Sequence, residues 1–287
     1  MTFYLVTTDH LEASIWFRNQ DDFKAAMNAI PLIAYAHGVI VLAFILMSNH
    51  VHFVLQCTYE QALAFINEFK RHCSYYLSRK YHIRETLKNN HVDIQELDFY
   101  EESLERAIAY VQMNSVAANI CIHPNGYPWG TGDCFFNVSS HKGIPLESLS
   151  ERARFRLLHS KMSPPGGLLI GEEGYILPES YVRTKFVESL YRTPKRMLVF
   201  LNQSSKAKTV INSSDSLIPS FKDQDILPMV EDLCRVLFKK KSIEELNPEQ
   251  QTEILRQMRY RFSSNINQMS RVTRLPYETV AKLLDSL

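Results

Sequence analysis

The chain has 287 residues, of which 45% are hydrophobic and 22% charged, an ordinary composition for a globular protein with room for more than one domain. Its 32 basic and 31 acidic side chains leave a formal net charge of only +1, so any surface for a polyanion must be local. No apolar run is long enough to cross a bilayer, no signal peptide opens the sequence and the five cysteines form no Cys-x-x-Cys pair, so we expect a cytoplasmic protein with reduced thiols and no membrane partner.

The first half of the chain alternates between strand and helix patterns. Short runs rich in β-formers predict four strands, at residues 3–8, 39–46, 50–57 and 93–97. Apolar residues at helical spacing predict three helices, over residues 21–30, 60–80 and 101–119. We expect Pro31 to end or kink the first helix, and the tight link between residues 46 and 50 to form a hairpin. The order β-α-β-β-α-β-α predicts an α+β fold with a ferredoxin-like, RRM-like antiparallel sheet.

Two other regions follow the domain predicted over residues 1–137. Prolines and glycines predict a loop-rich connecting region over residues 138–224, with one short helix at 149–159, an interrupted helix at 181–201 and a polar linker at 202–215. Helical patterns then predict a mostly helical C-terminal domain over residues 225–287. Its helices are expected at residues 228–240, 248–262, 265–272 and 276–284, and Asn247 with Gln250 predicts a capping box before the second.

The last two of these helices are spaced like a helix-turn-helix, in which the final helix enters the DNA major groove. Tyr277, Thr279 and Lys282 would then face the bases. A three-helix bundle that contacts another protein is the alternative. Further basic candidates for DNA contact, on the helix over residues 60–80 and near the end of the chain, are Lys70, Arg71, Arg271 and Arg274.

Two histidines separated by one residue, His50 and His52, lie in the apolar run from residue 39 to residue 55. Because side chains alternate along a strand, both imidazoles are expected on the same face of the sheet. Imidazole is a common metal ligand, although a His-x-His triplet in a strand is more often incidental. A metal site therefore needs a second feature.

The second feature is a tyrosine one helical turn before an asparagine. Tyr110 and Asn114 both lie in the helix predicted over residues 101–119, so they share one of its faces. Taken alone, a half-buried tyrosine and a surface asparagine explain this pair. Taken with the histidines, the pair suggests a site in which two imidazoles and an amide oxygen hold a metal beside a nucleophile.

At these residues the chain resembles a known family. The segment from Phe44 to Leu55 is similar to the HUH motif of single-tyrosine transposases, and residues 110–118 followed by Tyr-Pro-Trp-Gly at 127–130 are similar to the REP-associated tyrosine transposases within that group. The resemblance covers roughly the first half of the chain. It departs from the family at Ser115, where proline is usual, and at Gly130, where serine is usual.

The resemblance implies an HUH nuclease fold and metal-dependent cleavage of single-stranded DNA next to a hairpin. His50, His52 and Asn114 would hold Mg²⁺ or Mn²⁺, because a neutral N,N,O ligand set with open positions suits these ions better than structural zinc. Tyr110 would be the nucleophile and would form a 5′-phosphotyrosine, leaving a free 3′-hydroxyl that allows rejoining. The partner would be DNA from hairpin-forming or palindromic repeats, and the protein would act as a monomer or a homodimer.

Two other functions stay open. The first is a domesticated DNA-binding regulator whose terminal helices act while the nuclease is idle. The second is a metal hydrolase with a strand-end His-x-His pair that acts on a small molecule, a class that usually needs further His and Asp ligands on repeated βα units. Tyr127 and Trp129 are candidates for stacking on bases, although a packed turn that closes the domain explains them better.

Overall fold

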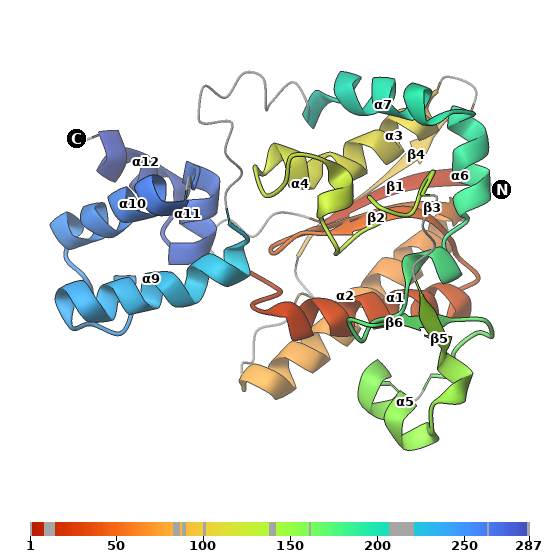
Figure 1. Ribbon diagram of the computed structural model, residues 1–287, viewed down its shortest axis with the longest axis horizontal. Helices are drawn as coiled ribbons and strands as arrows, with labels where there is room; N and C mark the ends of the chain where they lie inside the picture. The colour runs from red at the N-terminus through yellow and green to blue at the C-terminus, as the bar shows by residue number, and fades with distance from the viewer. Residues whose placement is uncertain are drawn as a thin grey trace.

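The computed structural model describes residues 2–8, 15–82, 87, 90–99, 102–137, 142–160, 162–206, 221–262 and 264–285. Its first part is an α+β domain around a four-stranded antiparallel sheet (Figure 1). The strands, in chain order, are β1 (Thr2–Thr8), β2 (Ile40–Leu46), β3 (Val51–Cys57) and β4 (Val92–Leu97). They lie in the order β2-β3-β1-β4, which is that of a ferredoxin-like split βαβ sheet. The α+β class and the order of elements expected from the sequence are confirmed.

Helices cover both faces of this sheet. Helices α1 (Gln20–Ala36) and α2 (Tyr59–Tyr81) pack on one face, drawn below the sheet in Figure 1, while α3 (Ser103–Gln112) and α4 (Asn114–Ala117) lie on the other. Alternation along β3 divides its side chains between the two layers. Phe53 points to α2, where its ring packs against Phe65 and Phe69 at centroid distances of 5.0 and 5.3 Å. The neighbouring His52 therefore points to the α3 side.

Three helix boundaries differ from those predicted. Helix α1 does not end at Pro31 but continues to Ala36, because the apolar residues after the proline are buried in the core. The helix predicted over residues 101–119 is divided at Met113 into α3 and α4. The division follows from Asn114, whose side chain donates hydrogen bonds to backbone carbonyls of the preceding turn. Helix α9 (Asp223–Phe238) begins before Pro228, because Asp223 and Ile226 are already buried at its start.

The region predicted as a connecting segment packs against the helices that cover the sheet. Helices α6 (Thr184–Tyr191) and α7 (Pro194–Gln203) lie over α3, and the Tyr191 hydroxyl donates to the Glu105 carbonyl oxygen at 2.6 Å. A small unit of β5 (Gly143–Pro145), β6 (Leu169–Gly171) and α5 (Glu151–Leu158) lies beside α1. The buried Asn28 of α1 binds this unit twice, donating to Leu157 O and accepting from Ile176 N.

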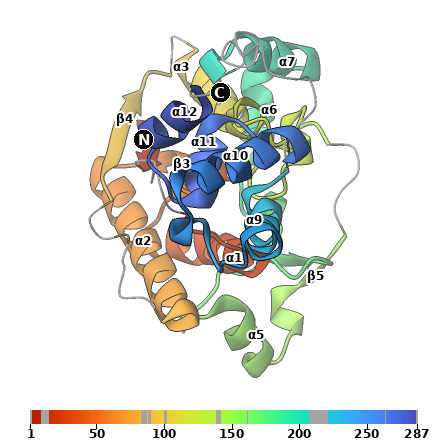
Figure 2. The same cartoon turned by 90° about the vertical axis from the view of Figure 1, so that its left-hand side faces the viewer.

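The C-terminal helices form a second core. Helices α9, α10 (Pro248–Phe262), α11 (Ile266–Thr273) and α12 (Tyr277–Asp285) enclose their own apolar cluster, and they face the viewer in Figure 2. The capping box predicted before α10 is confirmed by reciprocal hydrogen bonds between Asn247 and Gln250 of 3.2 and 2.9 Å. Helices α11 and α12 meet at Arg274, which adopts a left-handed conformation with φ of 62°. Within the described residues, every helix is too short or too polar to span a bilayer.

The turn around residue 130 closes the first domain, and its aromatic residues are packed inside it. The Tyr127 hydroxyl donates to Leu46 O at 2.8 Å, and the Trp129 ring stacks on Phe23 with a centroid distance of 4.9 Å. Gly130 lies against β2, where an added Cβ atom would be 2.8 Å from Phe44 O. This close approach explains why glycine, and not serine, stands at this position.

We expect Gly130→Ala to lower the free energy of unfolding by about 1–3 kcal/mol, because the new methyl group forces β2 and the turn apart. Thermal unfolding monitored by circular dichroism measures the change. Gly166→Ala is the matched control, since its Cβ would lie 3.6 Å from its nearest neighbour, Glu147 Oε1, an ordinary contact. Equal unfolding temperatures for the two variants would contradict the explanation.

Candidate active site

The two histidines project from the start of β3 into the layer between the sheet and α3. His50 ends the hairpin turn that joins β2 to β3, and His52 is the second residue of β3, with ring centroids 4.9 Å apart. Both side chains are buried. His50 Nδ1 hydrogen-bonds to Asn49 Oδ1 at 2.8 Å, and His52 Nδ1 to Thr7 Oγ1 at 3.0 Å. These bonds fix the orientation of each ring, so Nε2 is the nitrogen that would bind a metal.

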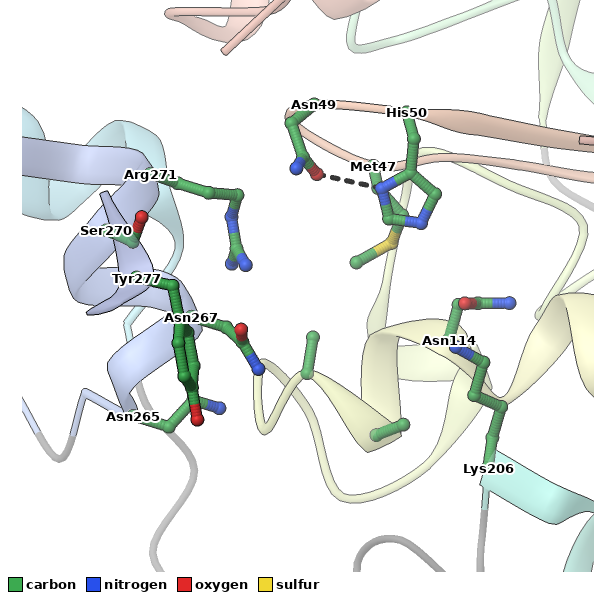
Figure 3. Close-up of a pocket in the computed structure, with 12 residues that line it drawn as sticks. Met47, Asn49, His50, Asn114, Lys206, Asn265, Asn267, Ser270, Arg271 and Tyr277 are labelled. Carbon is green, nitrogen blue, oxygen red and sulfur yellow. Dashed lines mark hydrogen bonds between the residues drawn. The ribbon is translucent and has the colours of Figure 1, made fainter. Parts of the chain in front are cut away.

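Tyr110 and Asn114 face the histidines from the opposite layer. The Tyr110 ring lies edge-on to His52, with centroids 5.5 Å apart and an interplanar angle of 88°. The Asn114 Nδ2 group donates to Tyr110 O at 2.9 Å and to Val111 O at 3.2 Å. With its amino group used in this way, the amide turns its oxygen away from the helix and toward the His50 side of the pocket (Figure 3). The break between α3 and α4 therefore orients a potential ligand atom.

These four side chains come from two segments that are far apart in the sequence, and the fold brings the segments together: His52 lies against Tyr110, and His50 and Asn114 line one pocket. Their donor set suits a divalent cation, because two neutral imidazoles and an amide oxygen leave positions for phosphate and water. Among the described residues, no group of three His, Cys, Asp or Glu side chains could hold a metal ion. The amide oxygen of Asn114, which lines the same pocket as His50, is a candidate third ligand.

Lys206 is a site residue that the sequence analysis missed. It follows α7, and its ammonium nitrogen lies 5.1 Å from the centroid of the Tyr110 ring. Partial burial lowers the pKa of its side chain, and burial likewise raises the pKa of the Tyr110 phenol. Nothing in the polar stretch from residue 202 to residue 215 marks this lysine, because only the packing of α7 on α3 carries it to the tyrosine.

A pocket of about 420 Å³ opens beside the histidines, and two domains line it. His50, Asn114 and Lys206, from the first domain, form one wall (Figure 3). The opposite wall belongs to the C-terminal helices and includes Asn267 and Tyr277. Tyr110 lines a second pocket, of about 360 Å³, with Ser204 and Gln203. Lys206 reaches both the first pocket and the Tyr110 ring, so it connects the two.

The two domains are held together by the buried carboxylate of Asp223, the first residue of α9. Arg271 donates to it from α11, with Nε 2.9 Å from Oδ2, and Gln268 Nε2 donates to Oδ1 at 2.9 Å. The hydroxyl of Ser48 donates to the same carboxylate from the hairpin turn that ends at His50. Burial by itself would raise the pKa of Asp223, but the charge of Arg271 and the three donors hold this pKa below its usual value.

The basic residues predicted to contact DNA occupy different environments. Lys70 is buried and donates to Asn90 O at 2.6 Å, and Arg271 is paired with Asp223, so neither presents an open cation to a phosphate. Arg71 is exposed beside Glu68, at 2.6 Å. Arg274, Tyr277 and Lys282 are exposed, and Thr279 is half-buried. The sequence shows which of these residues are basic and which lie on a predicted helix. It does not show which of the basic side chains are already engaged by a carbonyl or carboxylate oxygen elsewhere in the fold. Their contact with DNA stays a prediction.

Comparison with known proteins gives one distant match. No model of a known protein family matches the sequence, and no curated protein matches it. Among solved structures, the chain is similar to a REP-associated tyrosine transposase bound to a REP hairpin, with 10% sequence identity and a TM-score of 0.35. The match covers 45% of this chain and 76% of that protein. A likeness this distant carries no functional conclusion, so the function proposed below rests on the residues of the site.

We expect Asp223→Ala to lower the free energy of unfolding by about 3–5 kcal/mol, because it leaves the Arg271 guanidinium buried without a counter-charge. Urea unfolding followed by tryptophan fluorescence measures the loss. Asp232→Ala is the control: its carboxylate lies 2.9 Å from Arg235, but both side chains are about two-thirds exposed, so less than about 1 kcal/mol should be lost. Losses of equal size would show that Asp223 does not hold the domains together.

The contribution of Asp223 should also depend on pH. Because the folded-state pKa of this carboxyl is lowered, its stabilising effect is complete above its unfolded-state pKa and is lost as the pH falls through the folded-state value. The difference in unfolding free energy between the unmutated protein and Asp223→Asn should therefore stay constant down to about pH 4 and then shrink. Urea titrations over a series of pH values test this, and a difference that persists unchanged in strong acid would refute it.

Proposed function

We propose that this protein is a metal-dependent DNA nuclease and strand transferase, of the HUH transposase type, that uses Tyr110 as its nucleophile on single-stranded DNA beside a hairpin. The observation that supports the proposal is the meeting of the Tyr110 and His52 rings at 5.5 Å, with His50 4.9 Å further along the same face. Two imidazoles, an amide oxygen and a phenol are the groups that such a reaction requires.

In this proposal His50, His52 and Asn114 hold a divalent ion, Mg²⁺ or Mn²⁺. Their second-sphere partners are Thr7 and Asn49 for the two rings, and the carbonyls of the preceding helical turn for the asparagine. These hydrogen bonds orient the ligand atoms before any ion binds. When bound, the ion supplies positive charge to a non-bridging phosphate oxygen and to the departing oxygen.

The chain's own residues supply the rest of the reaction. The Tyr110 phenol releases its proton to solvent water and its oxygen attacks the phosphorus. An O–P bond to tyrosine forms while the bond from phosphorus to the 3′ oxygen breaks. The departing 3′ oxygen takes up a proton and becomes a hydroxyl. The phosphotyrosine bond that forms replaces the phosphodiester bond that breaks, so attack by a 3′-hydroxyl of another strand can reverse the step. Lys206, beside the Tyr110 ring, supplies a cation for the phosphate.

A second candidate function is supported by the C-terminal domain. Helices α11 and α12 are joined by a short turn, and Arg274 in the turn and Tyr277 and Lys282 on α12 are exposed. This arrangement fits a DNA-binding regulator in which the nuclease is idle. The two functions differ in one observable: only the transferase forms a covalent bond to DNA.

The test incubates the full chain with labelled DNA hairpins whose stems and single-stranded tails are randomised, in Mn²⁺ or Mg²⁺, and separates the products on a denaturing gel. We expect a labelled adduct that migrates with the protein, is abolished by a chelator and falls to background in Tyr110→Phe. Tyr35→Phe, which removes the same hydroxyl from an exposed tyrosine of α1, should leave the adduct unchanged. DNA binding without any adduct in the unmutated protein would instead support the regulator.

A further inference from the structure

The pocket beside the histidines has a wall that the proposed chemistry does not use. Asn267 of α11 and Tyr277, the first residue of α12, face His50, Asn114 and Lys206 across it (Figure 3). Three groups of the proposed site, His50, Asn114 and Lys206, therefore share one cavity with residues of α11 and α12, although they belong to a different domain. This wall has no role in holding the proposed ion.

The two residues on this wall are free to take up a ligand. Tyr277 keeps 42% of its surface exposed, and Asn267 is exposed too. Neither side chain has a hydrogen-bond partner among the residues that the structure describes. Their neighbour Asn265 differs, since its Oδ1 caps α11 by accepting from Gln268 N at 2.9 Å. Arg271 is also engaged, through its ion pair with Asp223.

The chemistry of the wall matches a nucleobase. An exposed phenol ring offers a flat surface on which any base can stack. A primary amide offers two donors and one acceptor, which suits the edge of a base that is not paired. Lys206 on the opposite wall supplies a charge for the backbone phosphate. A cavity of about 420 Å³ has the size of a small-ligand site and would take a base only after it has left a duplex.

We propose that Asn267 and Tyr277 form a binding site for one unpaired nucleotide next to the phosphate that is cleaved. The inference rests on the proposed function and extends it, because it assigns the choice of the flanking base to the C-terminal domain. Tyr277 stacks on the base and Asn267 hydrogen-bonds to its edge. With Tyr277 turned to the active site, the start of α12 reads a single strand, not the major groove expected from the sequence.

The experiment measures binding in the Tyr110→Phe background, so that no covalent step intervenes. The probe is a fluorescent DNA hairpin with oligo-dT tails on both sides, in which each tail nucleotide in turn is replaced by an abasic residue. We expect one position near the stem at which the abasic residue weakens binding by about 5- to 150-fold, as measured by fluorescence anisotropy. Adding Tyr277→Ala should weaken binding of the intact tail and remove this position-specific penalty.

Matched variants distinguish stacking on the Tyr277 ring from loss of its hydroxyl and from loss of an exposed tyrosine elsewhere. Tyr277→Phe keeps the ring and should keep the penalty, while Tyr35→Ala removes an exposed tyrosine from the far face and should change nothing. Asn267→Ala should level the affinities of tails that carry dA, dC, dG or dT at the sensitive position. Because Tyr277 is exposed, its variants should unfold at the temperature of the parent protein.

The possible results distinguish this inference from the function on which it rests. An abasic penalty that is the same with and without Tyr277 overturns the nucleotide site, even if the unmutated protein forms its Tyr110 adduct. A penalty that depends on Tyr277, in a protein that forms no adduct, supports the nucleotide site and refutes the transferase. A tailed hairpin that binds no better than a blunt one overturns the site as well.

Discussion

The geometry of the pocket beside the histidines depends on one buried carboxylate, that of Asp223. It lies between Arg271 and Gln268 of the C-terminal helices and Ser48 of the hairpin turn, two residues before His50. The backbone oxygen of Ser48 also accepts hydrogen bonds from Trp16 N and Phe17 N, so the turn is held from both sides. A buried charge with several donors is costly to disturb, because any displacement leaves an ion unpaired in a medium of low dielectric. The histidine-bearing turn and helices α9 and α11 therefore keep a fixed relative position.

A second constraint acts within one helix. Asn114 uses its amino group to bond two carbonyls of the turn before it, which divides α3 from α4. The same bonds turn its oxygen outward, so the side chain that competes for backbone carbonyls also presents the oxygen that we propose as a metal ligand. Tyr110, one turn earlier, is then held between the His52 ring and the ammonium of Lys206. The two hydrogen bonds of the Asn114 amino group therefore both divide the helix and orient the amide.

Predictions from local sequence patterns were correct where the structure of a segment depends on its own residues. The hairpin before His50, the order of strands and helices and the capping box at Asn247 all follow from neighbouring residues. Predictions failed where distant contacts intervened. Helix α1 continues past Pro31 because its later residues fill the core, and α9 begins early because Asp223 is anchored by another helix. Lys70 and Arg271 looked like open cations, but their partners come from other segments.

The sequence by itself determined that two imidazoles share one face of a strand and that a phenol and an amide share one face of a helix, because backbone periodicity sets both relations. Only the tertiary structure decided that these two faces meet and that Lys206 lies beside the Tyr110 ring. It also decided that Tyr277 lines the same pocket as His50 and Asn114. Those relations depend on how α3, α7 and the C-terminal helices pack, and packing is the sum of many contacts between residues distant along the chain. The spacing of residues along the sequence therefore does not predict which helices pack together.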